Sequence, residues 1–232
     1  MGLDASLKRY MSSYGPRNKD LRPITNSHDK EFHYLVADIE TSKWVNFICV
    51  GLFAGEMFEY YEDYGELFDA IMIWARAFAG DNSNIKWRDN EIEVFKKDDK
   101  GEPCLETKTE RTLSIPVFVH NGGRYDFNFF MKYIFTNQDP NLTFHSGIPI
   151  GSTVLSFKVR YQIKPDMFVE IMFWDSTKLL PFSLANLTEA FNVEHKKLEI
   201  EYKAITEVTP ELLEYLEHDC RGHYEVLQTF FS

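Results

Sequence analysis

The sequence predicts an α/β domain in which one mixed β-sheet is flanked by helices. Apolar strand-like runs alternate along the chain with amphipathic helical patterns. A hydrophobic content of 44% and an aromatic content of 16% are enough for a substantial core. The length of 232 residues fits a single domain built around such a core.

The first half of the domain is expected to contain two strands and a helix. Strands are predicted over residues 32–40 and 44–53, joined by a polar turn at Thr41–Lys43. Apolar residues spaced by three and four then predict an amphipathic helix over 66–78.

Two segments are expected to lie outside the core. Residues 1–30 are polar and predict a flexible N-terminal arm, which leaves 31–232 as the folded domain. Residues 80–114 are charged and poor in apolar side chains, so we expect a surface excursion there, in the form of a loose hairpin.

The central part of the chain predicts a third strand, a second helix and an extra β-hairpin. The strand covers 114–121 and ends in a turn, and a helix begins near Asp126. The segments 153–161 and 167–175 alternate as a hairpin does.

Two further helices have recognisable N-caps. Ser183 precedes an apolar stripe over 184–191. Thr209 followed by Pro210 predicts the start of the last helix.

The composition also restricts the class of protein. No apolar run approaches the ~18 residues of a membrane helix, and the first residues lack an apolar signal-peptide core. The three cysteines are scattered, so we expect reduced thiols in an intracellular protein. A net charge of −11 argues against a basic phosphate-binding patch. It does not argue against a nuclease, whose acids bind cations that then meet the phosphate.

Acidic residues occur at three notable points. Asp38 and Glu40 lie two apart at the end of the first strand and share a face. Asp126 begins a helix after a buried strand, where α/β folds often place chemistry. Tyr215 and Asp219 lie one turn apart on the last helix. Taken separately, these residues are better explained as solvated acids, a helix N-terminal acid and polar neighbours of a core stripe.

Taken together, the acids indicate a metal site. The first and third strands can be neighbours in a sheet that the last helix covers. Four carboxylates gathered there, without lysines between them, would repel one another unless cations neutralised them. Mg²⁺ and Mn²⁺ prefer such all-oxygen sites, and two ions ~3.5–4 Å apart support phosphoryl displacement. The neutral phenol of Tyr215 would position a water molecule.

These residues resemble a known family. The segments "DIET" (38–41), "NGGRYD" (121–126) and "YLEHD" (215–219) are similar to the three motifs of DEDD-type 3′–5′ exonucleases of the tyrosine subtype. Residues 174–202 resemble the segment before the third motif in protein-primed family-B DNA polymerases. The resemblance covers about 200 residues, from near residue 32 to the C-terminus. It implies a ribonuclease-H-like (DnaQ-like) exonuclease fold.

The resemblance also implies roles for individual residues. Asp38, Glu40 and Asp219 would hold one divalent cation, while Asp38 and Asp126 would hold the second. Tyr215 would orient the attacking water, and Lys197 would lie near the scissile phosphate. The positions matching contacts to single-stranded DNA are Thr41, His120, Asn121, Tyr125, Phe129, Ser176, Thr177, Phe182 and Tyr202.

Some of these assignments have structural alternatives. Lys197 could be a solvated side chain, and the neighbouring Lys196 leaves one residue of ambiguity. Phe129 and Phe182 could be core residues, and Asn121 could be only a turn residue. Aromatic side chains at the site would suit base stacking, which is worth ~1–3 kcal/mol per base.

The expected function is a metal-dependent 3′–5′ exonuclease that releases nucleoside 5′-monophosphates from single-stranded DNA. One alternative is an RNA exonuclease or oligoribonuclease of the same fold, because contacts to the 2′-OH decide that preference. Another is a non-catalytic module that binds single strands. No polymerase-type Y-x-D-T-D-S signature occurs in the chain, so an excised polymerase domain and a free-standing enzyme both stay open. A polymerase partner would act in cis or in trans.

Overall fold

A computed structural model describes residues 32–43, 45–199 and 206–232. Phe32–Ser232 form one compact unit. The predicted arm over 1–30, together with Trp44 and Tyr202, lies outside the described residues, so the proposed domain boundary stays a prediction.

The secondary structure follows an α/β order. The strands are β1 (Leu35–Ser42), β2 (Asn46–Ala54), β3 (Met57–Tyr61), β4 (Trp87–Lys97), β5 (Pro103–Val119), β6 (Leu142–Ile150), β7 (Thr153–Lys164) and β8 (Met167–Asp175). The helices are α2 (Tyr64–Ala77), α3 (Asp126–Thr136), the 3₁₀ turn η1 (Ser176–Lys178), α4 (Leu184–Ala190) and α5 (Pro210–Phe231).

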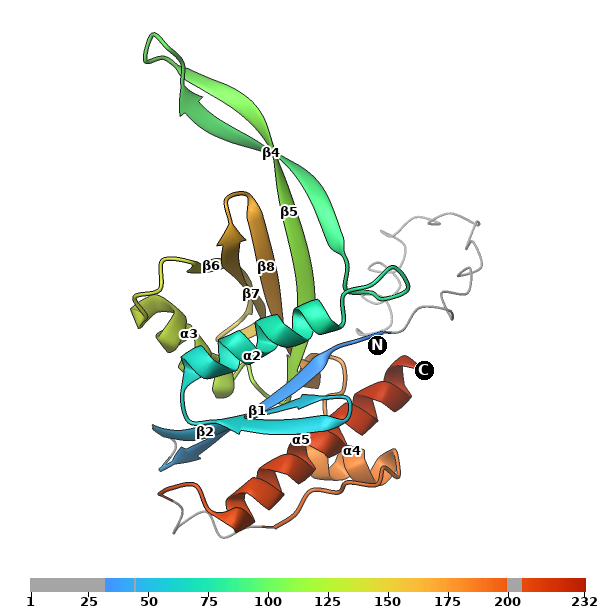
Figure 1. Cartoon of the computed structure of the whole chain (residues 1–232). Coiled ribbons are helices and arrows are strands. Elements are labelled where there is room, and N and C mark those ends of the chain that lie inside the picture. Colours follow the sequence, from blue (N-terminus) through green and yellow to red (C-terminus); the bar gives the residue numbers. More distant parts are fainter. Residues whose placement is uncertain (1–31, 44, 200–205) are drawn as a thin grey trace, which may run out of the picture. The chain divides into compact units, whose positions relative to one another are not determined.

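The strands form one mixed sheet in the order β3-β2-β1-β5-β8-β7-β6, with β4 paired to β5 (Figure 1). The three central strands β1, β5 and β8 run parallel, with Leu35 opposite Val117 and Val119 opposite Asp175. The predicted adjacency of the first and third strands is therefore confirmed. Because parallel strands end at the same edge, the residues that follow β1, β5 and β8 come together.

Each face of the sheet has its own core. Leu35, Ala37 and Ile39 of β1 pack with apolar residues of α2 and α3. Tyr34 and Val36 point to the opposite face, where they pack with α4 and α5. This alternation confirms the predicted mixed sheet flanked by helices, and the last helix covers β1 and β2 as expected (Figure 1).

The excursion over 80–114 is more regular than predicted. β4 and β5 pair from Trp87 opposite Leu113 to Lys97 opposite Pro103. The expected hairpin is therefore confirmed, but it is a regular two-stranded ladder and not a loose one. β5 then continues without a break into the buried central strand, and the hairpin projects beyond the rest of the sheet (Figure 1). Exposed cross-strand contacts such as Lys96 with Glu106, at 2.9 Å, accompany a ladder of main-chain hydrogen bonds.

Two edge strands were not predicted. β6 has only Leu142 buried and contains Gly147 and Pro149, which are poor strand formers. β3 is short and mostly half-exposed. Their pairing depends on main-chain groups of the neighbouring strand, which leave no alternating apolar pattern in the sequence.

The predicted helix starts are largely confirmed. The Ser183 hydroxyl accepts a hydrogen bond from the amide of Asn186, and the Thr209 hydroxyl accepts one from the amide of Leu212. α2 begins two residues earlier than predicted, because Asp63 caps the amides of Gly65 and Glu66.

The cap of α5 predicts a modest loss of stability on substitution. Thr209→Ala removes the acceptor for the Leu212 amide, 3.2 Å away, and should lower the free energy of unfolding by about 1 kcal/mol. Thr209→Ser keeps the hydroxyl and should cost much less. Urea unfolding of the two variants measures the difference, and equal losses would contradict the capping role.

The three cysteines are free, as expected. None of the described helices is long and apolar enough to cross a membrane.

Candidate functional site

A cavity of about 1010 Å³ opens at the edge where β1 and β5 end. Its lining comes from the end of β1, the turn between β5 and α3, the segment from η1 to α4, and α5. All four acids singled out in the sequence, together with Tyr215, line this cavity: Asp38, Glu40, Asp126 and Asp219.

Each acid reaches the cavity for a local structural reason. Asp38 and Glu40 continue the face of β1 that Val36 turns toward α5, as the two-residue spacing predicted. Asp126 is the first residue of α3 and is buried. Asp219 lies one turn after Tyr215 on the buried side of α5.

The "NGG" turn before Asp126 is shaped by contacts within the protein. Asn121 adopts the left-handed conformation, with φ of 61°. A Cβ on Gly123 would lie 2.1 Å from the carbonyl oxygen of Val154. The Gly123 amide donates to Asp175 Oδ2 at 3.1 Å. The turn therefore packs against the start of β7 and the end of β8, and this packing places Asn121 and Asp126 at the cavity.

Asp175 is a supporting residue that lies inside the 174–202 segment but was given no role from the sequence. Its Oδ1 accepts hydrogen bonds from the amide and the hydroxyl of Thr177, at 3.0 and 2.7 Å. Its other oxygen binds the Gly123 amide. One buried carboxylate thus joins two of the loops that line the cavity. An acid directly after a buried parallel strand was the signal in the sequence.

The electrostatics of the cavity are those of crowded carboxylates. Burial raises the pKa of Asp38, and the charge of Asp219 raises it further. Burial also raises the pKa of Glu40, with added repulsion from Asp38 and Asp219. The pKa of Asp126 is raised by burial and then by the charge of Asp38. Burial and at least one neighbouring acid therefore disfavour ionisation of Asp38, Glu40 and Asp126.

One cation of the chain lies among these acids. The Lys197 ammonium donates to Asp219 Oδ2 and to the Tyr215 hydroxyl. It also lies 4.6 Å from the centre of the Tyr215 ring. The expectation that no lysine stands between the acids is therefore wrong. The ambiguity between the two lysines is also resolved, because Lys196 is exposed.

The donor set fits a divalent cation. Asp219 Oδ1 is buried and has no hydrogen-bond partner among the described residues. A buried carboxylate oxygen without a partner is costly, and a hard cation would satisfy it. Among the described residues, the four acids do not form a group whose ligand atoms all lie within 4.8 Å of one another. One Lys197 ammonium does not balance four carboxylates, so the site still favours added positive charge.

The residues predicted to contact a DNA strand mostly line the same cavity. They are Thr41, His120, Asn121, Tyr125, Phe129, Thr177 and Phe182. Ser176 is not among the lining residues. It is buried and hydrogen-bonded through its Oγ to His120 Nδ1 at 2.9 Å, so it supports His120. Tyr202 lies outside the described residues.

The two phenylalanines differ in their surroundings. Phe182 is 61% exposed, which excludes the alternative of a core residue. Phe129 is partly buried against the core and also lines the cavity. Tyr125 is half-exposed, so two aromatic rings are accessible for stacking at the cavity.

Several lining residues were not singled out from the sequence. They include three exposed cations, Lys43, Arg124 and Lys178, and His223, which is buried in the cavity wall. Arg124 lies inside the second motif. It was not singled out because the net charge of the chain is acidic.

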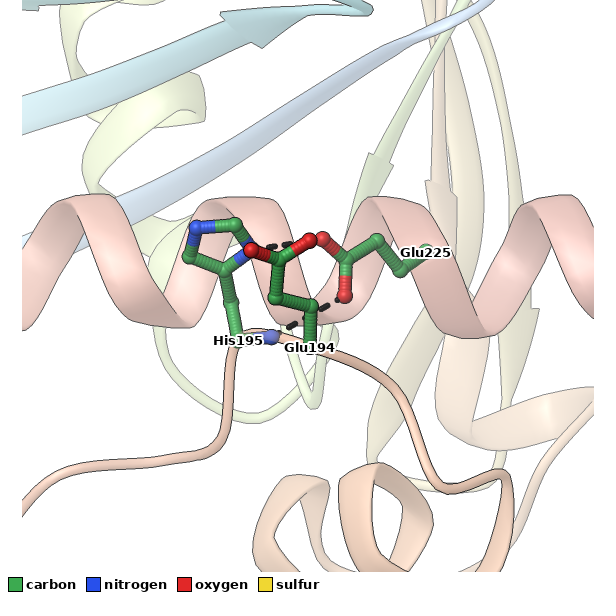
Figure 2. Close-up of side chains that lie close together, drawn as sticks. All are labelled: Glu194, His195 and Glu225. Atoms are coloured by element: carbon green, nitrogen blue, oxygen red, sulfur yellow. Dashed lines mark hydrogen bonds and ion pairs between the residues drawn. The ribbon is translucent and has the colours of Figure 1, made fainter.

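A second group of charged residues lies outside the cavity. Glu194, His195 and Glu225 present ligand atoms within 4.8 Å of one another, a spacing compatible with a metal ion (Figure 2). Both carboxylate oxygens of Glu225 already accept hydrogen bonds from His195, and Glu194 is exposed. We therefore interpret the group as a hydrogen-bonded contact between a loop and a helix.

Comparison with known proteins points to DNA polymerases. Residues 111–210 match the family model described as DNA polymerase type B, organellar and viral. The DNA-directed DNA polymerase of Enterobacteria phage PRD1 is 27% identical over 145 residues, which are 59% of this chain and 22% of that protein.

Solved structures agree with this match. The structure of phi29 DNA polymerase complexed with primer-template DNA has a TM-score of 0.58 at 14% identity, covering 87% of this chain and 31% of that one. The complex of the same polymerase with single-stranded DNA has a TM-score of 0.55 at 15% identity, covering 85% and 31%. The chain thus spans less than a third of each of these relatives. The predicted ribonuclease-H-like fold and the resemblance to protein-primed family-B polymerases are both confirmed.

Proposed function

We propose, from this similarity to family-B DNA polymerases, that the chain is a metal-dependent 3′–5′ exonuclease. Its substrate would be the 3′ end of single-stranded DNA, and its product a nucleoside 5′-monophosphate. The observation that carries the proposal is the convergence of Asp38, Glu40, Asp126, Asp219 and Tyr215 on one cavity. A complex of phi29 DNA polymerase with single-stranded DNA is among the similar structures, which supports the choice of substrate.

The acids would hold two divalent cations, Mg²⁺ or Mn²⁺. Asp38, Glu40 and Asp219 would bind one and Asp38 and Asp126 the other. When bound, the cations supply charge stabilisation for the attacking and leaving oxygens of the phosphodiester. The unpartnered Oδ1 of Asp219 and the mutual repulsion of the acids support this assignment.

The remaining residues would bind and orient the substrate. The Tyr215 hydroxyl and Glu40 would hold the attacking water, and Lys197 would offer positive charge to the phosphate. Asn121 and Tyr125 would position the terminal nucleotide. Phe182 would stack on a base, while Arg124 and Lys178 would contact backbone phosphates outside the acidic centre.

An end-labelled substrate assay tests the proposal. Single-stranded DNA and RNA, each labelled at the 3′ or the 5′ end, are incubated with the full chain and Mg²⁺ or Mn²⁺. Mononucleotides released from the 3′ end of DNA, and lost on chelation, are the expected result. Preferred degradation of RNA would favour an oligoribonuclease. Binding of single strands without any metal-dependent degradation would favour the non-catalytic module and overturn the proposal.

Tyr215→Phe should slow the reaction without abolishing it. The substitution removes a hydroxyl that would position water, and we expect kcat to fall about 10- to 100-fold. KM for single-stranded DNA should change by less than about threefold, because the ring remains. Steady-state kinetics measure both constants, and an unchanged kcat would contradict the water-positioning role. Tyr224→Phe is the control, because Tyr224 lies on the same helix but does not line the cavity.

One relative also bears on the origin of the chain. The PRD1 polymerase is a phage protein, which supports a viral or phage origin. A polymerase would be the natural partner, either in the same polypeptide or as a separate protein. The reading frame that encodes this chain shows whether a polymerase belongs to the same polypeptide. A pull-down with a DNA polymerase domain from the same source tests for a separate partner.

A further inference from the structure

The segment that carries Lys197 has no regular secondary structure of its own. Residues 194–199 follow α4 without forming a helix or strand. A lysine side chain has four rotatable bonds and loses about 2 kcal/mol of conformational entropy when held in one place. The position of the Lys197 ammonium therefore depends on what holds this backbone against α5.

Glu225 of α5 holds the segment by two hydrogen bonds. Its Oε2 accepts from the backbone amide of His195 at 3.1 Å, and its Oε1 accepts from His195 Nδ1 at 2.5 Å. Figure 2 shows both bonds between the loop and the helix. The side chains of His195 and Glu225 are each 25% exposed, so solvent competes only in part for these bonds.

Two more residues of α5 complete the contact. A Cβ on Gly222 would lie 2.3 Å from the carbonyl oxygen of His195, so only glycine allows this approach of loop to helix. His218 Nδ1 donates to the carbonyl oxygen of Lys196 at 3.2 Å. Steps of four and three separate His218, Gly222 and Glu225, which places them along one side of α5.

The same helix carries the groups that Lys197 contacts. Two residues after His195, the Lys197 ammonium binds Asp219 and the Tyr215 hydroxyl. The loop is thus bound to α5 at its backbone by Glu225 and at its lysine tip by Asp219. Only the second contact lies in the cavity.

We infer that Glu225, through its two hydrogen bonds to His195, is a positioning residue that fixes the Lys197 ammonium beside Asp219 and Tyr215. The inference rests on the exonuclease function proposed above, and it gives Glu225 a role outside the cavity. Glu225 acts through Lys197 and touches neither the substrate nor the cations.

Kinetics of the full chain test this role. Glu225→Ala should lower kcat for single-stranded DNA about 10- to 100-fold, because a displacement of about 1 Å at a catalytic group has effects of that size. Glu225→Gln retains an acceptor oxygen for the His195 amide and should recover most of the activity. In a Lys197→Ala background, Glu225→Ala should lower kcat by less than about threefold further, because the two residues act on one contact. Equal losses in both backgrounds would overturn the inference.

The matched control is Glu217→Ala. Glu217 forms an ion pair with Arg221 on the same helix, and it makes no hydrogen bond or ion pair with the described loop residues 194–199. If its loss lowers kcat as much as Glu225→Ala does, the effect is one of helix stability, and the inference fails. Melting temperatures of all variants show whether each one folds.

A second readout does not need activity. Acetylation by acetic anhydride, measured for each lysine by peptide mass spectrometry, reports how accessible the Lys197 amine is. Glu225→Ala should increase labelling of Lys197 and leave the exposed Lys196 unchanged. Absence of exonuclease activity in the wild type would overturn the proposed function, while this labelling would still decide the inference. Unchanged Lys197 labelling in Glu225→Ala would refute it.

Discussion

Asp38→Ala is expected to lower the rate of 3′ mononucleotide release by at least about 10³-fold. Asp38 is the one acid proposed to serve both cations, and the charge stabilisation that such ions supply amounts to several kcal/mol. Asp219→Ala should have an effect of similar size, because it removes the buried unpartnered Oδ1 and also the partner of Lys197. Gel-based release of labelled nucleotides measures both variants.

Removing the charge of Asp38 should raise stability although it lowers activity. Asp38 and Asp219 repel each other in a buried setting, so Asp38→Asn without added metal should raise the free energy of unfolding by about 1 kcal/mol. Mn²⁺ should raise the melting temperature of the wild type and have little effect on this variant.

The control for Asp38 is Asp89→Ala, which removes an exposed acid of the β4–β5 hairpin. It should leave both rate and stability unchanged. If Asp38→Ala retained wild-type activity, the proposed metal site would be wrong, whatever fold the chain has.

Gly123→Ala is the second substitution with a large expected effect. The added methyl group would meet the carbonyl oxygen of Val154 at 2.1 Å and Asp175 Oδ2 at 2.8 Å. Neither can move freely, since Val154 belongs to β7 and Asp175 already binds Thr177. Overpacking of this kind costs about 1–3 kcal/mol or more.

The turn would have to shift to relieve that clash, and Asn121 and Asp126 would shift with it. We therefore expect a fall in activity of about 10²-fold in addition to the loss of stability. Gly80→Ala is the matched control, because nothing lies within 4 Å of a Cβ at that position. Urea unfolding and the end-labelled assay, applied to both variants, separate the two effects. A Gly123→Ala protein as stable as the Gly80→Ala protein would contradict the packing described here.

Fold class was predictable because most elements leave a side-chain pattern. The apolar stripe and the Thr209 cap predicted α5, and the alternating pattern of β7 and β8 predicted their hairpin. The strands β3 and β6 left no such pattern, since their stability comes from main-chain pairing at the edges of the sheet. The charged residues over 80–114 also lack an apolar alternation, so a loose hairpin was predicted where the structure has a regular one.

The candidate site was predictable only in part. The motif residues were found by resemblance, and the structure brings them to one cavity. Asp175 lies inside the 174–202 segment but was given no role, and Glu225 belongs to none of the motifs. Both act through hydrogen bonds to backbone groups distant in sequence. The spacing of residues along the chain does not predict contacts of this kind between distant segments.

The mixed α/β class, the helix caps and the acids of the three motifs could be predicted because each of them depends on residues close together in the chain. Which lysine enters the site, how the glycine-rich turn packs and what holds the loop of Lys197 on α5 became clear only in the folded structure. These depend on close approach between segments, such as Gly123 with Val154 and Gly222 with His195. Contacts of this kind exist only once the parallel strands and the last helix are assembled.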